Sequence, residues 1–135
     1  MSKSLIYTAN TSTQVLAVDS IVNPGTVVRR FGPNLNLSGN AIQIAGAGYY
    51  DIDASFVVAP TAAGEVTITA YLNNVAIPGA VATATVAAGG DFVTLPITGA
   101  FREACQCCEG LSNLTFVLTG TAANVTNSAI VVEKK

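Results

Sequence analysis

The segment Tyr50-Asp-Ile-Asp-Ala-Ser-Phe56 alternates apolar and polar residues without a break, and Glu65-Val-Thr-Ile-Thr-Ala-Tyr-Leu72 does so again. Successive side chains of a β-strand point to opposite faces, so this period of two predicts strands with one buried face and one solvated face. In the first segment the expected core face consists of Tyr50, Ile52, Ala54, Phe56 and Val58. The opposite face consists of Tyr49, Asp51, Asp53 and Ser55.

The rest of the chain also has the pattern of short strands, and no segment predicts a helix convincingly. Glycine and proline recur at short intervals between the apolar segments, as in an all-β sandwich. The Ala-rich segment 80–88 could form a helix by propensity, but its valines and threonines favour a strand. The predicted strands are 4–9, 13–18, 26–31, 35–37, 41–45, 49–58, 65–73, 80–87, 91–98, 100–104, 113–119 and 124–133.

The composition indicates one domain with a surface that is poor in charge. A chain of 135 residues is expected to form a single domain over residues 1–135. Charged residues make up 10% of it and hydrophobic residues 50%, with a mean hydropathy of +0.51. The net charge of −2 provides no basic field, so nucleic-acid binding is not expected. Exposed apolar patches usually mark interfaces, so this composition favours oligomerisation.

The sequence lacks the residues that most enzyme mechanisms use. It contains no histidine, which removes the commonest general base, the commonest metal ligand and any Ser-His or Cys-His pair. The remaining candidates, among Asp, Glu, Cys, Tyr and Lys, show no recognisable catalytic spacing. We expect a protein that is not an enzyme and that needs no cofactor or resident metal.

Targeting signals are also absent from the sequence. No apolar run approaches the roughly 20 residues that a membrane helix needs. The segment 1–8 contains one lysine but no apolar core followed by a cleavage site, so it does not resemble a secretory signal. The expectation is synthesis in a cytosol without membrane association.

Three cysteines, Cys105, Cys107 and Cys108, lie close together, and an odd number cannot pair fully within one chain. They are interpreted first as free or partly oxidised thiols. A second interpretation is that they cross-link subunits in an oxidising setting. A third, less favoured, is a metal site completed by Glu103 or Glu109.

Two further groups of charged residues have candidate roles. Asp51 and Asp53 share a strand face and could bind calcium, although a solvated face is the simpler interpretation. Arg29 and Arg30 are adjacent on a strand and should point to opposite faces. At most one of these arginines can therefore pair with a ligand or with a carboxylate of another subunit.

Three segments in series resemble the tumour necrosis factor and complement globular-head families. Gly46-Ala-Gly-Tyr-Tyr-Asp-Ile-Asp-Ala-Ser55 resembles their strand that opens with glycine and an aromatic residue, and 66–79 resembles the hairpin that follows it. Asn124-Val-Thr-Asn-Ser-Ala-Ile-Val-Val-Glu133 is similar to their closing strand, which lies beside the first strand. The resemblance implies a two-sheet antiparallel jelly-roll sandwich of about ten strands that assembles as a homotrimer.

Among such families, the chain looks most like phage head-fibre or capsid decoration proteins and the heads of spore-surface glycoproteins. It has no Gly-X-Y stalk, which separates it from the second group. The resemblance therefore implies a non-catalytic homotrimer on the virion surface, made in the host cytoplasm. Its expected partners are a second copy, a phage capsid protein and a surface glycan or protein.

Two alternatives remain open at this stage. One is a bacterial extracellular or spore-surface module that recognises glycans or host proteins. The other is an immunoglobulin-like monomer, which the absence of a core tryptophan disfavours.

For the trimer, Tyr49, Tyr71 and Phe101 are the predicted residues near the threefold axis, because aromatic rings, especially those with a polar tip, suit interfaces.

Overall fold

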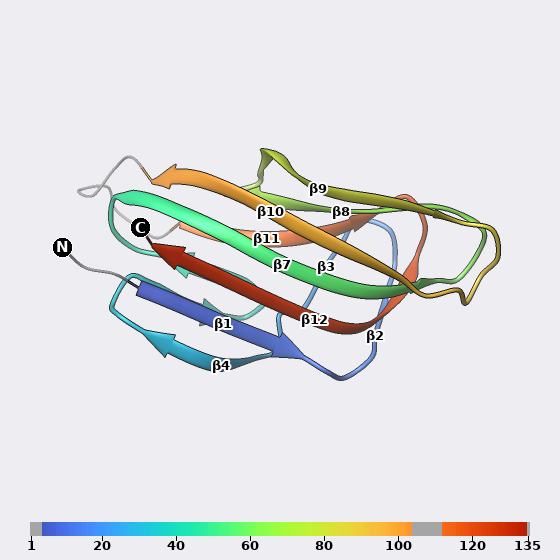
Figure 1. The fold of residues 1–135 in the computed structure, drawn as a ribbon, viewed down its shortest axis with the longest axis horizontal. Coiled ribbons are helices and arrows are strands. Elements are labelled where there is room, and N and C mark those ends of the chain that lie inside the picture. Colours follow the sequence, from blue (N-terminus) through green and yellow to red (C-terminus); the bar gives the residue numbers. More distant parts are fainter. Residues whose placement is uncertain (1–3, 104–111, 135) are drawn as a thin grey trace.

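The computed structural model describes residues 4–103 and 112–134, and these residues form twelve strands in two layers (Figure 1). The strands are β1 (Ser4–Asn10), β2 (Gln14–Leu16), β3 (Ser20–Ile21), β4 (Thr26–Phe31), β5 (Leu35–Ser38), β6 (Ala41–Ile44), β7 (Gly48–Pro60), β8 (Gly64–Leu72), β9 (Val75–Val86), β10 (Val93–Glu103), β11 (Ser112–Thr119) and β12 (Ala123–Lys134).

The strands form two six-stranded antiparallel sheets. The first, sheet A, has the order β10-β7-β12-β1-β4, with β2 added to β12. The second, sheet B, has the order β5-β6-β11-β8-β9, with β3 added to β11. The chain passes repeatedly from one sheet to the other, which is the jelly-roll arrangement that the sequence predicts. The closing strand lies beside the first as expected, with Lys134 opposite Ser4.

The core lies between the two sheets and includes the residues of the strand 49–58 that the alternation assigned to it. Tyr50, Ile52, Ala54, Phe56 and Val58 of β7 are all buried. Phe56 contacts Phe116 of sheet B, with ring centroids 5.3 Å apart and planes tilted by 54°. Tyr50 stacks on Phe101 of β10, and its hydroxyl donates a 2.8 Å hydrogen bond to the carbonyl of Gly46.

Some predicted strand boundaries were wrong. The strands predicted at 91–98 and 100–104 are one continuous strand, β10, because Gly99 keeps an extended pairing with Ile52 and does not end it. The strand predicted at 80–87 begins at Val75 instead. Pro78 fits inside it because β9 is the edge strand of sheet B, where a missing backbone donor is tolerated.

The turns are made by residues with unusual backbone angles. Asn73 and Asn74 both have positive φ, 52° and 68°, which closes the short turn between β8 and β9.

In the part of the chain that the structure describes, no helix is long and apolar enough to span a membrane.

Candidate interaction surface

The outward face of sheet B is polar and mostly uncharged. Its strands alternate buried apolar residues with half-buried or exposed ones, many of which are threonines, and Val81 and Val117 lie among these threonines. The outward threonines are Thr67, Thr69, Thr83, Thr85, Thr115 and Thr119. This face has the composition of a solvated surface.

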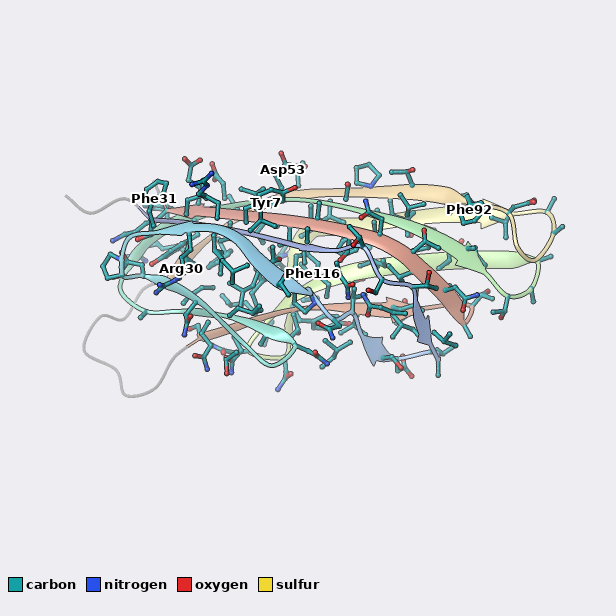
Figure 2. The ribbon with its side chains drawn as sticks, turned by 90° about the horizontal axis from the view of Figure 1, so that it is seen from below. Tyr7, Arg30, Phe31, Asp53, Phe92 and Phe116 are labelled. Atoms are coloured by element: carbon teal, nitrogen blue, oxygen red, sulfur yellow. The ribbon has the colours of Figure 1, made fainter. Side chains whose placement is uncertain are left out.

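The outward face of sheet A is different, because apolar and charged side chains occupy it together. Leu5 and Tyr7 of β1 and Val131 of β12 are only half-buried. Tyr49 at the start of β7 is 62% exposed. Figure 2 shows Tyr7 and Asp53 on this outward side. Large apolar side chains in such positions are typical of a surface that another chain covers.

Three carboxylates gather in the middle of this face. Asp51 lies directly opposite Glu133, and Asp53 lies on the same face of β7 as Asp51. They line a hollow of about 380 Å³ together with Thr98 of β10. We call this feature, made by Asp51, Asp53, Glu133 and Thr98, the acidic hollow. Like charges opposite each other on a sheet repel, so a nearby cation would stabilise the folded state.

The register of the strands brings these three carboxylates together. From the sequence, calcium was considered as a ligand of two of them, Asp51 and Asp53. Within residues 4–103 and 112–134, no group of three or more His, Cys, Asp or Glu side chains is placed to hold a metal ion. Glu133 was not among the predicted site residues. Its position beside Asp51 could have been found from the pairing of the closing strand, which places residue 133 next to the strand 49–58.

The two arginines of β4 point in opposite directions, as predicted. Arg30 lies opposite Ile6, and its Nε donates a hydrogen bond to the carbonyl of Leu35 in sheet B. Arg29 lies opposite Tyr7 and belongs to the outward face of sheet A. Of the two, only Arg29 is therefore placed to meet a group on another molecule at this face.

The side of the sandwich next to β4 is unusually apolar. All six residues of β4 are exposed, and β4 is the edge strand of sheet A. Of the ten exposed large hydrophobic residues in the described chain, six come from 15–31. They form what we call the edge patch: Val15, Val18, Ile21, Val27, Val28 and Phe31.

The edge patch follows one side of the molecule. The strand β2 continues the line of β1 along β12, and β3 continues the line of β6 along β11. Long apolar edge strands invite pairing with other chains and are normally blunted or covered. The sequence predicted strand 26–31 but gave no signal that both of its faces would be exposed.

The predicted trimer-interface residues do not share one surface. Tyr49 is on the outward face of sheet A, whereas Tyr71 is on the outward face of sheet B, opposite Thr115. Phe101 points between the sheets, where it stacks on Tyr50 and lines an apolar hollow of about 290 Å³ beside Ile77 and Pro78. Of the three, Tyr49 remains the candidate for a contact in sheet A. Cys105, Cys107 and Cys108 lie outside the described residues.

Comparison with solved structures decides the fold. The chain superimposes on murine APRIL with a TM-score of 0.74 at 9% identity, covering 98% of this chain and 99% of that one. It superimposes on the Eiger TNF of S. frugiperda with a TM-score of 0.64 at 9% identity, covering 98% and 91%. The chain has a tumour necrosis factor-like jelly-roll fold.

A third structure shares the tumour necrosis factor-like jelly roll and comes from a phage. The PRD1 vertex protein P5 matches with a TM-score of 0.61 at 16% identity, covering 98% of this chain and 96% of that one. Neither the family models nor the curated proteins gave a match to this sequence. At these identities the likeness establishes the fold alone, so any function that it suggests is a proposal.

Proposed function

We propose that the chain is a non-catalytic structural protein of a phage virion, a homotrimer that decorates the capsid or forms a head fibre. The observation that carries the proposal is the match to the PRD1 vertex protein P5 over nearly the whole of both chains. The low charge of the sequence supports the homotrimer, because a surface with few charges favours association.

The asymmetry between the two sheets supports self-association. Sheet B exposes mainly threonines, with Val75 and Val81 on its edge strand β9, whereas sheet A and the neighbouring edge patch expose most of the large apolar side chains. A closed assembly that covers sheet A and leaves sheet B in water would account for this difference. The proposed trimer therefore buries the outward face of sheet A and the edge patch.

The two ends of the sandwich differ in a way that gives the particle an orientation. The terminal strands begin and end together, since Ser4 pairs with Lys134 (Figure 1). The loops 61–63 and 87–92 lie at the opposite end, where the amide of Gly90 donates a 2.7 Å hydrogen bond to the carbonyl of Pro60 at the end of β7. In the proposed arrangement the end with the termini docks on the capsid and these loops face outward.

The solution mass of the purified chain tests the assembly. By light scattering we expect a mass of three times 13.7 kDa, both with and without a reductant. A trimer lost only on reduction would instead make the cysteines its cross-links. A monomer in both conditions would contradict the proposed homotrimer.

One observation favours a recognition role as the second candidate. Phe92, at the loop end of the sandwich, is 67% exposed (Figure 2), and an exposed aromatic ring on a loop is a common anchor for a partner. An extracellular or spore-surface module would use this end to bind a glycan or host protein. Immunogold labelling of phage particles and of whole cells with antibody against the chain separates the candidates. Label on phage heads is expected, and label confined to the cell or spore surface would contradict the virion proposal.

A further inference from the structure

The described chain buries four polar residues: Ser4, Thr8, Ser112 and Ser128. Two of them are hydrogen-bonded. The hydroxyl of Ser4 donates a 2.8 Å hydrogen bond to Oδ1 of Asn34, and the hydroxyl of Ser112 accepts one of 3.2 Å from Nδ2 of Asn73. Thr8 and Ser128 are different. Both are 0% exposed, and neither hydroxyl has a hydrogen-bond partner among the residues that the structure describes.

An unpaired hydroxyl is costly in an apolar core, because it gives up its hydrogen bonds to water and gains none in exchange. Ser128 lies opposite Phe56 of β7, and Thr8 lies opposite Ile130 of β12. Both of these apolar neighbours are buried in the core. In native proteins most buried polar atoms are bonded to other protein atoms or to ordered water. The two hydroxyls of this core therefore point to a bound polar molecule.

The two unpaired hydroxyls are neighbours on adjacent strands. The strands β1 and β12 lie side by side (Figure 1), and Ser128 is two residues before Ile130, the residue opposite Thr8. Such diagonal neighbours are about 7–8 Å apart, and their side chains cover part of this distance. Two O–H···O hydrogen bonds of about 2.8 Å span up to about 5.6 Å. One molecule bonded to both hydroxyls fits this separation.

A third polar group, the side chain of Asn10, lies beside the same two hydroxyls. Asn10 is directly opposite Ser128 and two residues after Thr8 on β1. Its Nδ2 donates a 3.2 Å hydrogen bond to the carbonyl of Asn23, and its Oδ1 accepts one of 3.0 Å from the amide of Ser12. An amide oxygen can accept two hydrogen bonds, so Oδ1 has the capacity for another. Buried water molecules typically make about three hydrogen bonds, which these three groups can provide.

The chemistry of the three groups selects water as their ligand. Each hydroxyl can donate or accept a hydrogen bond, and the amide oxygen accepts one. A water molecule can satisfy all three, because it donates two hydrogen bonds and accepts others. A cation would be expected to need carboxylate ligands, since an uncompensated charge is expensive to bury. The nearest carboxylates of sheet A, Asp51 and Asp53, lie on its outward face instead.

We propose that one internal water molecule is bound on the inner face of sheet A, between β1 and β12. It accepts a hydrogen bond from one of the two hydroxyls, and it donates to the other hydroxyl and to Oδ1 of Asn10. The water joins the first strand to the last near the end of β1, away from the termini. The site lies within one chain, so it does not depend on the proposed homotrimer.

Removing the two hydroxyls singly and together tests the bridge. Thr8→Val and Ser128→Ala are each expected to lower the unfolding temperature by about 4–8 °C, because the remaining hydroxyl is left unpaired in the core. The double variant leaves neither hydroxyl, so it is expected to unfold at a higher temperature than either single variant. Differential scanning calorimetry at one protein concentration measures these shifts.

The sign of the shifts separates a bridging water from a dry core. If no water bonded the two hydroxyls, each single variant would remove an unpaired group and raise the unfolding temperature, and the two effects would add. That result would overturn the site. Thr115→Val and Ser55→Ala are the matched controls, because they make the same chemical changes at half-buried positions on the outward faces of sheets B and A. Their shifts should stay within about 2 °C.

A crystal structure of the wild-type protein tests the site directly and needs no variant. We expect an ordered water within about 2.5–3.0 Å of both Oγ1 of Thr8 and Oγ of Ser128. Density that shows no water bonded to both atoms overturns the inference, even where Thr8→Val fails to fold. A monomeric wild type would contradict the proposed homotrimer and leave this site standing.

Discussion

Replacing Phe116 with alanine is expected to lower the free energy of unfolding by about 3–5 kcal/mol, the usual cost of truncating a buried phenylalanine. Phe116 is 1% exposed on β11 and contacts Phe56 of the opposite sheet, with ring centroids 5.3 Å apart. The substitution leaves a cavity between the two sheets, where neither can close without moving the other. Typical domains are stable by about 5–15 kcal/mol, so this loss is a large part of the total.

The measurement is urea unfolding followed by circular dichroism. Wild type and variant have to be compared at the same protein concentration, because dissociation of an oligomer contributes to the apparent stability. Val117→Ala, the next residue on the same strand, is the matched control. Its side chain is half-buried on the outward face of sheet B, so the loss should be about 1 kcal/mol or less. Equal losses in the two variants would show that Phe116 does not join the sheets.

The sequence predicted the core well because the core depends on a local pattern. A strand with one buried face repeats every two residues, so the inward positions of β7 and β8 can be assigned without knowing their neighbours. Phe56 and Val66 are both buried, as the alternation predicted. The fold followed from three segments whose order resembles that of a known family.

The predicted interface depended on non-local register and was harder to assign. Phe101 was assigned to a separate strand after Gly99, so its orientation was not tied to Leu95 and Ile97, which are buried. In the continuous strand β10, residues 95, 97 and 101 point the same way, which turns Phe101 toward Tyr50. A glycine that stays extended does not interrupt the alternation. Composition alone does not show which glycines stay extended and which end a strand.

The acidic hollow and the edge patch lay beyond sequence reasoning for a related reason. Asp51 and Asp53 were recognised as neighbours because they share one strand, whereas Glu133 is more than 75 residues away and joins them only through the register of β12 with β7. Arg29 was recognised as pointing away from Arg30. Its distance from the carboxylates depends on the order β7-β12-β1-β4, which no local pattern specifies.

Replacing Gly120 with alanine is expected to lower the free energy of unfolding by about 3 kcal/mol, because two costs act at one position. Gly120 lies in the turn between β11 and β12 with φ of 90°, a conformation that residues with a Cβ rarely adopt. A Cβ there would also collide with the backbone carbonyl oxygen of Glu65. That oxygen already accepts a 2.9 Å hydrogen bond from the hydroxyl of Thr121, so moving it would disturb a second contact.

Gly79→Ala provides the matched control for Gly120→Ala. Gly79 has a similar φ of 81°, but no atom lies within 4 Å of the position that its Cβ would take. Its substitution should therefore cost only the backbone strain, about 1 kcal/mol. The difference between the two variants in urea unfolding measures the close approach of the β11–β12 turn to β8. If the two losses were equal, the turn would be free to move away from Glu65. The end of the sandwich that faces outward in the proposed particle would then be less tightly packed than the region between the two sheets.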